Sequence, residues 1–491
     1  MALGEVTVNR EFEQLLDKVR REGGEIRSDS REVGKGDIFV AVPGVNADGA
    51  RFIPPAVEAG ASTIVCLPGG AEAEAARAAG CTVVHHDDPR EALWRLAEAR
   101  WHTGSLPLRV LGVTGTNGKT TSAYLLEHLF TATGHKVGVL GTVSYRWPGH
   151  CEAAPLTTPD PLRVHAMLAA MAQAGVDIAV MEVSSHALEQ QRVCGVPFAG
   201  ASFSNLTQDH LDFHQDMESY FRAKSRLFLE LPRADKVMAI NGDDPWGRRL
   251  LELCPRALSF GLQKALPQQR HLWGELLSAG TDGCHLRMHL DGQQWELRSP
   301  LVGAFNASNL LSVQALALEL GLMPDDLRHL EDFHGVCGRL ERVPNARKLH
   351  VFVDYAHTPD ALVNVLKALR GAGFKRIVTV FGCGGNRDRT KRPIMGEAVA
   401  RYSDVAVLTS DNPRFEDPEA ILKDVLPGLR EAREVVVEVD RRKATAKAVE
   451  MLGPDDALLI AGKGYEDYQI IQGTKHHYSD QEVVRELLGC A

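Results

Sequence analysis

The chain has 491 residues, a formal net charge of −9, 44% hydrophobic and 24% charged residues, the composition of an ordinary globular protein. The acidic balance argues against a general nucleic-acid-binding protein. The N-terminal stretch lacks the apolar core of a signal peptide, and no span approaches the roughly 18 uninterrupted apolar residues of a membrane helix. Nine scattered cysteines without a C-x-x-C pair indicate neither a zinc site nor a disulfide framework and fit a reducing cytoplasm. At this length we expect about three domains.

The first section, residues 1–88, is predicted to be a small α/β domain. Strands are expected at 37–42 and 62–66, with a helix at 53–59 between them. A helical stretch at 89–102 leads into the second section.

The stretch 108–121, LRVLGVTGTNGKTT, joins a buried-strand pattern to a glycine-containing turn and the start of a helix. Gly115 and Gly118 let the backbone curl so that its N–H groups point at one spot, which makes an anion cradle at the helix N-terminus. Lys119 would reach phosphate oxygens, and the Thr120 hydroxyl is placed to ligate magnesium. Val113 occupies the first glycine position of the Walker pattern, yet the flanking strand and helix favour a phosphate-binding loop over a plain turn. The sequence therefore predicts binding of ATP or GTP.

Strands and helices alternate after this loop, which is typical of a mostly parallel sheet covered by helices. We expect strands at 137–143, 177–183 and 199–205 and helices at 161–174 and 309–320. Residues 256–300 differ, because they predict an antiparallel hairpin turned at Asp291-Gly292. From about residue 338 a second, smaller open α/β sheet is predicted, with strands at 349–354, 376–381, 405–409, 435–439 and 457–460 and helices at 360–370 and 444–451. The predicted fold is α/β, with a small N-terminal domain (1–88), a central P-loop-type domain (89–337) and a C-terminal domain (338–491).

Polar residues follow two strands of the central section. Glu182 ends an apolar strand and could hold a second magnesium ion or its water shell, while a helix cap by Ser184 explains the same segment equally well. The run TQDHLDFH at 207–214 holds two histidines and two acids, a density that favours a functional over a structural role. Residues 220–228 predict a helix whose basic side chains would ordinarily form a solvated face.

The C-terminal section delivers charged or glycine-rich loops from four of its strands. These loops are DYAH at 354–357, GCGGNRDRTKRP at 382–393, SDNPR at 410–414 and GKGYE at 462–466. Ligands collect at the carboxyl ends of strands in open α/β sheets. The mixture of guanidinium groups and acids suits a substrate that carries both carboxylates and ammonium groups.

Together these segments resemble the Mur ligases, the ATP-dependent amide ligases that build the peptide of the peptidoglycan precursor. The resemblance covers essentially the whole chain and rests on DSR (29–31), TGTNGKTT, Thr157-Thr158, EVSSH, DHLDFH, RAKSRLF, GAFNASN, DYAHTPD, GCGGNRD, DNPR and GKGYE. DNPR at 411–414 resembles the tetrapeptide of members that add meso-diaminopimelate, and lysine-adding members lack its arginine. One departure is Tyr465, where the family's usual GKGHE has histidine.

The resemblance implies a set of ligand contacts. ATP is expected at Gly115, Thr116, Asn117, Gly118, Lys119, Thr120, Thr121, Asn306 and Asp354. UDP-N-acetylmuramoyl-L-alanyl-D-glutamate is expected at Ser28, Ser30, Val45, Asn46, Ala47, Thr157, Thr158, Ser184, Gln190 and Arg192. Diaminopimelate is expected at Arg387, Asp411, Asn412, Pro413, Arg414, Gly462 and Glu466.

The resemblance also implies a chemistry in which the substrate's carboxylate is activated as an acyl phosphate before an amine attacks it. Lys119, Glu182, His210 and Lys224 are the implied catalytic residues. Mg²⁺ is expected at Thr120, Glu182, His210 and Lys224, the last as a carbamate (N6-carboxylysine), because the added carboxylate turns a repelling ammonium into an anionic ligand. We expect a monomeric bacterial cytoplasmic enzyme with ATP and Mg²⁺ as cofactors, without nucleic-acid partners.

Two rival ligases and one silent homologue remain as alternatives. A lysine-adding member conflicts with DNPR, and a folylpolyglutamate synthetase conflicts with the DSR and NADG segments of a uridine-nucleotide domain. A catalytically silent nucleotide-binding homologue conflicts with the presence of Lys119, Thr120, Glu182, His210 and Lys224.

Overall fold

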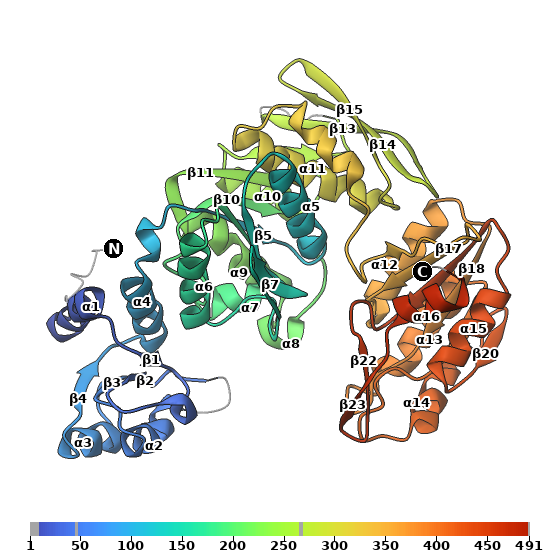
Figure 1. Ribbon diagram of the computed structural model, residues 1–491. Coiled ribbons are helices and arrows are strands. Elements are labelled where there is room, and N and C mark those ends of the chain that lie inside the picture. The colour runs from blue at the N-terminus through green and yellow to red at the C-terminus, as the bar shows by residue number, and fades with distance from the viewer. Residues whose placement is uncertain (1–8, 45–47, 265–268, 490–491) are drawn as a thin grey trace. The chain divides into compact units, whose positions relative to one another are not determined.

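A computed structural model describes residues 9–44, 48–264 and 269–489 (Figure 1). The described chain forms two compact units, Met1–Ser259 with Ala315–Leu322, and Phe260–Gln314 with Met323–Ala491. The predicted α/β class with parallel sheets is confirmed. The three domain boundaries stay a prediction.

The N-terminal section is a four-stranded parallel sheet in the order β1-β2-β3-β4. Its strands are β1 (Ile26–Arg27), β2 (Ile38–Val40), β3 (Thr63–Cys66) and β4 (Thr82–His85), and its helices are α1 (Arg10–Glu22), α2 (Ile53–Glu58), α3 (Ala71–Ala78) and α4 (Pro89–Trp101). Helix α1 was not predicted. Its signal is the run of buried residues Phe12, Leu15, Leu16 and Val19, whose spacing gives one apolar helix face.

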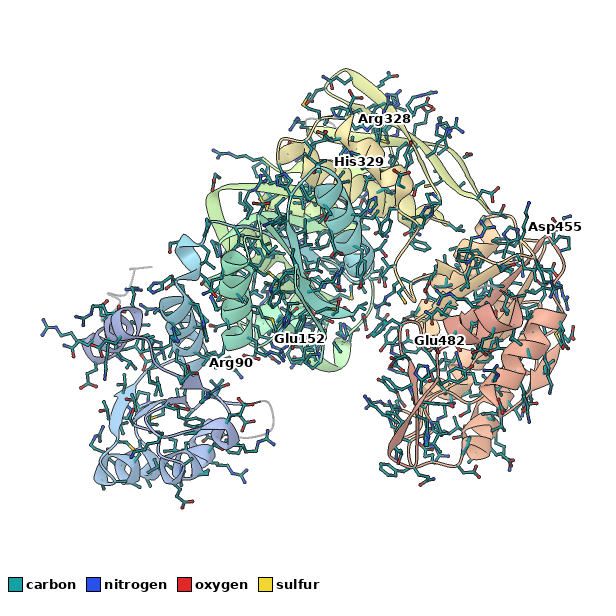
Figure 2. All side chains as sticks on the ribbon, in the orientation of Figure 1. Arg90, Glu152, Arg328, His329, Asp455 and Glu482 are labelled. Atoms are coloured by element: carbon teal, nitrogen blue, oxygen red, sulfur yellow. The ribbon has the colours of Figure 1, made fainter. Side chains whose placement is uncertain are left out.

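The first unit continues with a parallel sheet in the order β11-β10-β5-β9-β6, extended by the antiparallel strands β7 and β8. The strands are β5 (Arg109–Thr114), β6 (Val137–Leu140), β7 (Ser144–Trp147), β8 (His150–Ala153), β9 (Ile178–Glu182), β10 (Phe198–Phe203) and β11 (Pro232–Asn241). The helices are α5 (Lys119–Ala132), α6 (Pro161–Gln173), α7 (Ser185–Glu189), α8 (Leu211–His214), α9 (Met217–Leu229) and α10 (Pro245–Leu253). Glu152 of β8, labelled in Figure 2, accepts a hydrogen bond from Arg163 of α6 at 2.6 Å, which links the added antiparallel strands to a helix of the same unit.

The antiparallel hairpin predicted around Asp291-Gly292 is confirmed. Strand β14 (Gly283–Leu290) pairs with β15 (Gln293–Ser299), and β13 (His271–Gly280) pairs with β14. Both turn residues have positive φ, 51° at Asp291 and 80° at Gly292, as a two-residue hairpin turn requires. Strand β12 (Leu258–Gly261) spans the boundary between the two units, and helix α11 (Ala304–Glu319) begins earlier than predicted.

The C-terminal sheet has six strands in the order β16-β17-β21-β18-β19-β20, and only the edge strand β16 is antiparallel. Its strands are β16 (Glu341–Arg342), β17 (His350–Asp354), β18 (Arg376–Phe381), β19 (Val405–Leu408), β20 (Val435–Val437) and β21 (Asp456–Ala461). Its helices are α12 (Pro359–Gly371), α13 (Lys391–Tyr402), α14 (Pro418–Val425), α15 (Arg441–Glu450) and α16 (Asp480–Leu487), and a hairpin of β22 (Tyr468–Ile471) and β23 (Thr474–His477) follows β21. Separate apolar clusters fill the two faces of the sheet. Strands β17, β21, β18 and β19 are neighbours, so their carboxyl-terminal loops meet at one edge.

Candidate functional site

The predicted phosphate loop connects β5 to α5. Gly115 has φ 148° and Gly118 has φ 87°, and a Cβ on Gly115 would lie 1.9 Å from the Ser204 hydroxyl. The loop is held by the segment after β10, because the backbone N–H of Asn117 donates to Asn205 Oδ1 at 3.0 Å and Ser204 donates to the Asn117 carbonyl at 2.6 Å. The N-terminus of α5 therefore opens from a rigid, glycine-dependent turn that presents backbone N–H groups.

Glu182 lies fully buried at the carboxyl end of β9, the strand next to β5. Its carboxylate accepts hydrogen bonds of 2.9 Å from the hydroxyls of Thr120 and Thr142 and from the backbone N–H of Thr142. A Cβ at Gly141 would lie 2.3 Å from Glu182 Oε1, so only glycine permits this approach. The structure thus brings Thr120 and Glu182 together as an oxygen-rich group of the kind that suits Mg²⁺.

Lys224 is 1% exposed, which makes the predicted solvated basic face of this helix wrong at that residue. The helix turns Lys224 inward, and its Nζ donates to the carbonyl of Gly115 at 2.9 Å. Lys119 donates to the same carbonyl and to that of Thr116, each at 2.9 Å. Burial, and then the charge of Lys119, lower the pKa of Lys224 well below its usual value. The Gly115 carbonyl, in the phosphate loop, therefore accepts hydrogen bonds from both Lys119 and Lys224.

His210 lies on the exposed segment that leads into α8 and has φ 54°. Its ring is edge-on to the rings of His186 and Tyr220, at centroid distances of 4.9 and 6.1 Å. Tyr220 also stacks on His214, whose Nε2 lies 2.9 Å from the Ser185 hydroxyl. In the described part of the chain, no group of three or more His, Cys, Asp or Glu side chains is arranged to hold a metal ion. A Mg²⁺ site here would therefore need the Thr120 hydroxyl and the carbamylated Lys224 predicted above, in addition to Glu182 and His210.

Thr158 connects the segment before α6 to the end of β9. Its buried hydroxyl donates to the Glu182 carbonyl at 2.8 Å and accepts from the Ser184 N–H at 3.1 Å. Arg192 donates to the Thr158 carbonyl at 3.0 Å and to Gln190 Oε1 at 2.6 Å. Ser184 caps α7 by accepting from the Ala187 N–H at 3.2 Å, so the capping alternative is observed. The Thr157 hydroxyl lies 3.2 Å from that of Thr142. These residues and Glu182 form one connected polar group.

The predicted uridine-nucleotide residues follow β1 in the N-terminal sheet. Ser28 is exposed and Ser30 is half-buried at the start of a short 3-10 helix. Val45, Asn46 and Ala47 lie outside the described residues.

Asn306 and Asp354 belong to the second unit. Asn306, in the first turn of α11, donates to the carbonyl of Val302, which precedes the helix, at 2.9 Å. Asp354 ends β17 and accepts from the backbone N–H groups of Leu340 at 2.6 Å and Ala356 at 2.7 Å. Burial raises the pKa of Asp354 above its usual value.

A cavity of about 420 Å³ opens at the carboxyl edge of the C-terminal sheet. All four neighbouring strand loops contribute to its lining, as their predicted convergence requires. Of the residues predicted for diaminopimelate, the cavity is lined by Arg387, Asp411, Asn412, Arg414, Gly462 and Glu466, and Pro413 lies beside them in the chain. Tyr355 also lines the cavity, and Tyr465 stacks on it at a centroid distance of 5.1 Å.

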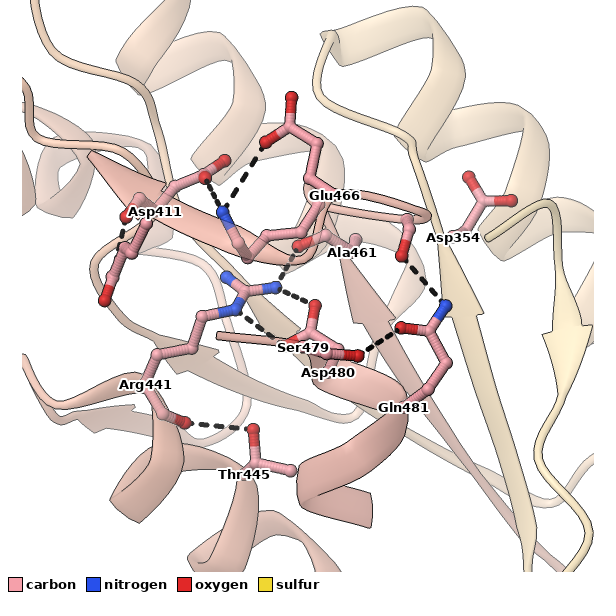
Figure 3. Close-up of polar contacts among 12 residues, drawn as sticks. Asp354, Asp411, Arg441, Thr445, Ala461, Glu466, Ser479, Asp480 and Gln481 are labelled. Carbon is pink, nitrogen blue, oxygen red and sulfur yellow. Dashed lines mark hydrogen bonds and ion pairs between the residues drawn. The ribbon is translucent and has the colours of Figure 1, made fainter. Parts of the chain in front are cut away.

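A buried lysine joins the acidic residues of this cavity. Lys463 is fully buried, and its Nζ lies 3.5 Å from both Asp411 Oδ1 and Glu466 Oε2 and 3.3 Å from Asn412 Oδ1 (Figure 3). Asn412 in turn donates to Glu466 at 2.9 Å. Two acids and one ammonium leave a net negative charge, which can receive an ammonium group of a ligand.

The opposite charge is carried by Arg414, which has φ 54° and donates through Nη1 to the Gly385 carbonyl at 2.9 Å. Gly385 has no room for a side chain, because a Cβ would lie 1.9 Å from the Pro413 carbonyl. The loop at 382–390 is braced by Arg392, which is 1% exposed and donates to Glu416 and Asp424 at 2.8 Å each. The cavity therefore presents both guanidinium groups and carboxylates, the two kinds of partner that an amino acid with both charges requires.

Family models match three parts of this chain: "Mur ligase family, catalytic domain" at residues 24–101, "Mur ligase middle domain" at 113–317 and "Mur ligase, glutamate ligase domain" at 338–464. A UDP-N-acetylmuramoyl-L-alanyl-D-glutamate–2,6-diaminopimelate ligase from Lawsonia intracellularis is 56% identical over 463 residues, 94% of this chain and 95% of the relative. The chain belongs to the Mur ligase family.

Another relative and two solved structures are also similar to this Mur ligase. The enzyme of the same name from Thermosynechococcus vestitus is 44% identical over 94% of this chain and 92% of its own length. A solved structure of a ligase of that name superposes with a TM-score of 0.69 at 32% identity, covering 95% of this chain and 94% of that one. MurF from Acinetobacter baumannii, at 17% identity with a TM-score of 0.62 over 98% of both chains, shows the shared fold. No helix in the described part of this Mur ligase is long and apolar enough to cross a membrane.

Sequence reasoning missed three supporting residues of this Mur ligase. Thr142 and Ser204 were assigned to strand ends, whereas β6 ends at Leu140 and β10 at Phe203, which frees both hydroxyls to hold functional loops. In the sequence, Lys463 stands out only as part of the GKGYE motif. A lysine between two glycines gives no sequence signal that its ammonium will be buried against Asp411 and Glu466.

Proposed function

We propose that this Mur ligase joins meso-2,6-diaminopimelate to UDP-N-acetylmuramoyl-L-alanyl-D-glutamate at the expense of ATP. The observation that carries this proposal is the C-terminal cavity, in which Arg387 and Arg414 supply positive charge and Asp411, Asn412 and Glu466 supply acceptors. The 56% identity to a ligase of that name supports it. A lysine substrate has no second carboxylate for Arg414, and we therefore place the lysine-adding alternative second.

The phosphate loop is the proposed ATP site. Backbone N–H groups at the start of α5 would receive the triphosphate, and Lys119 would exchange its carbonyl partners for phosphate oxygens. Thr120, Glu182, His210 and carbamylated Lys224 would hold Mg²⁺, whose positive charge offsets the charge that builds up on the transferred phosphoryl group. The oxygen donors around Glu182 fit this ion.

The proposed carbamate at Lys224 forms when the neutral amine adds carbon dioxide and releases one proton. Burial under Gly115 and the nearby charge of Lys119 both disfavour an ammonium at this position. The product is an anion, which would attract Lys119 instead of repelling it.

The reaction has two steps. The D-glutamyl carboxylate attacks the γ-phosphorus of ATP, which gives an acyl phosphate and ADP. An amine of diaminopimelate then attacks the acyl carbon, the tetrahedral intermediate releases phosphate, and an amide remains. Thr157, Thr158, Ser184, Gln190 and Arg192 are the proposed contacts of the muramoyl-dipeptide, and Ser28, Ser30 and 45–47 those of the uridine nucleotide. Asn306 and Asp354 are proposed to contact the nucleotide.

A phosphate-release assay with separate amino acids tests this proposal. The purified protein, ATP, Mg²⁺ and the UDP-muramoyl-dipeptide should release phosphate with diaminopimelate and far more slowly with lysine or glutamate. Comparable release with lysine would favour the lysine-adding alternative, and release with glutamate on a folate substrate would favour a folylpolyglutamate synthetase. We also propose a monomer in the bacterial cytoplasm, where the nucleotide substrates are made.

A further inference from the structure

The loop that follows β21 is held at two of its carbonyl groups by side chains that do not line the cavity. Arg441 Nη2 donates to the carbonyl of Ala461 at 2.9 Å, and Gln481 Nε2 donates to the carbonyl of Gly464 at 2.9 Å (Figure 3). The two carbonyls flank Gly462 and Lys463. The loop is therefore fixed on both sides of its buried lysine.

Both holding side chains are themselves locked. Arg441, the first residue of α15, makes a two-bond ion pair with Asp480, the first residue of α16, at 2.9 Å from Nε to Oδ1 and 2.7 Å from Nη2 to Oδ2. The side chains of both residues are 0% exposed. Gln481 accepts from the Ser479 hydroxyl at 3.1 Å and donates to Glu341 at 3.0 Å. These bonds leave Arg441 and Gln481 little freedom to follow a moving loop.

The held loop carries the polar atoms of the cavity. Gly462 and Gly464 have φ of 118° and 54°, and a Cβ on Gly464 would lie 2.7 Å from the Tyr355 Cβ. Between them Lys463 reaches Asp411, Asn412 and Glu466, and the Glu466 N–H donates to the Lys463 carbonyl at 2.9 Å. A shift of this loop would move the ammonium and the Glu466 carboxylate together.

Stability alone explains this arrangement poorly. Replacing a buried ion pair by apolar residues of similar volume is often neutral or stabilising, because burying two charges is costly. Arg441 adds to that cost, since its Nη1 is buried without a hydrogen-bond partner among the described residues. A fixed position for the Ala461 carbonyl is what the charged fork supplies and an apolar pair would not.

We propose that Arg441, Asp480 and Gln481 are positioning residues for the amino-acid substrate. They fix the loop at 462–466 so that Lys463 holds Asp411 and Glu466 where these carboxylates can bind the ligand's ammonium group. This inference rests on the proposed function, because it takes the cavity as the diaminopimelate site. None of the three residues lines the cavity, so each acts through the loop.

The test compares two full-length variants with a control. Gln481→Met removes the donor to Gly464 with little change in shape, and the double variant Arg441→Met with Asp480→Leu replaces the ion pair by an apolar pair. The control is Arg370→Met, which breaks the 2.7 Å ion pair with Asp404 before β19, at the amino edge of the same sheet. Initial rates give KM for diaminopimelate, for ATP and for the UDP-muramoyl-dipeptide, and thermal unfolding gives Tm.

We expect the Gln481→Met variant and the double variant each to raise the KM for diaminopimelate by about 5- to 20-fold, less than the roughly 100-fold that a 1 Å misplacement of reacting groups can cost. The KM for ATP should stay within about twofold of the parent. The control should leave all three KM values unchanged. An unchanged diaminopimelate KM in folded Gln481→Met overturns the proposal, whether or not the double variant folds. Equal rises in all three KM values would also overturn it, because they indicate general loosening.

The substitution Arg414→Ala separates this inference from the proposed function. If Arg414→Ala raises the diaminopimelate KM but Gln481→Met does not, the cavity is the substrate site and the positioning role of Arg441, Asp480 and Gln481 is wrong. If neither variant changes it, the cavity itself has been assigned wrongly and both proposals fall.

Discussion

Replacing Arg414 by alanine removes a charged fork from the C-terminal cavity. Its Nη1 already donates to the Gly385 carbonyl at 2.9 Å, which holds the guanidinium plane and leaves its other N–H groups for a ligand. A carboxylate of diaminopimelate can accept two parallel hydrogen bonds from such a fork. The substitution should therefore weaken binding of diaminopimelate and of no other substrate.

The expected size follows from the bonds that are lost. A hydrogen bond to a charged group contributes about 1.5–3 kcal/mol, so losing a two-bond contact, part of which water replaces, costs about 2–4 kcal/mol. That free energy corresponds to a rise of roughly 30- to 1,000-fold in the KM for diaminopimelate, if KM follows binding. Arg414→Lys keeps the charge but loses the fork, and it should raise KM by only about tenfold.

Steady-state phosphate release at saturating ATP measures these effects, with lysine as an internal control. Lysine offers no second carboxylate, so its slow turnover should be the same in the parent and in Arg414→Ala, and the preference for diaminopimelate should collapse. A diaminopimelate KM that does not change in Arg414→Ala would refute the pocket assignment. A parallel loss of lysine turnover would point instead to general disruption of the loop.

Three further perturbations test the rest of the site and the fold. Lys224→Ala should be nearly inactive and regain part of its ligase activity with added formate or acetate, whereas unimpaired turnover would exclude the carbamate role. Glu182→Gln should lower kcat by about 100-fold or more, since it removes a fixed charge beside the proposed triphosphate site; a parent-like kcat at the parent's magnesium requirement would contradict this. Burial holds the pKa of His165 at about 4, below its ordinary 6.5. Between pH 6.5 and pH 4 the unfolded chain therefore binds a proton at His165 and the folded chain does not. The free energy of unfolding falls as the pH drops through this range, by about 2 kcal/mol at pH 5. In urea unfolding, His165→Gln should lose that much less stability than the parent between pH 7.5 and pH 5, and equal losses would refute the assignment.

Much of the fold follows from local patterns. Alternating apolar runs and helical periodicity predicted the parallel strands, and Asp291-Gly292 predicted the hairpin, because these signals depend on neighbouring residues alone. Strand ends were less predictable. Residues 141–143 read as a continuation of the strand, but the chain leaves the sheet after Leu140 so that Gly141 and Thr142 can approach Glu182.

Some features of the candidate site could likewise be predicted from the sequence, and others could not. The loops after β17, β18, β19 and β21 could be expected to converge, since parallel strands deliver their carboxyl ends to one edge. The burial of Lys224 could not be read from its helix, because the carbonyl of Gly115 that receives it lies 109 residues away in the chain. The pairing of Arg441 with Asp480, 39 residues apart, is equally invisible to local patterns.

The mass of the nucleotide product tests the central claim most directly. The purified protein is incubated with ATP, Mg²⁺, the UDP-muramoyl-dipeptide and equimolar diaminopimelate and lysine. The products are separated, and their masses are measured by mass spectrometry. We expect a UDP-muramoyl-tripeptide that carries diaminopimelate almost exclusively. A product that carries lysine, or no tripeptide at all from a folded protein that binds ATP, would contradict it.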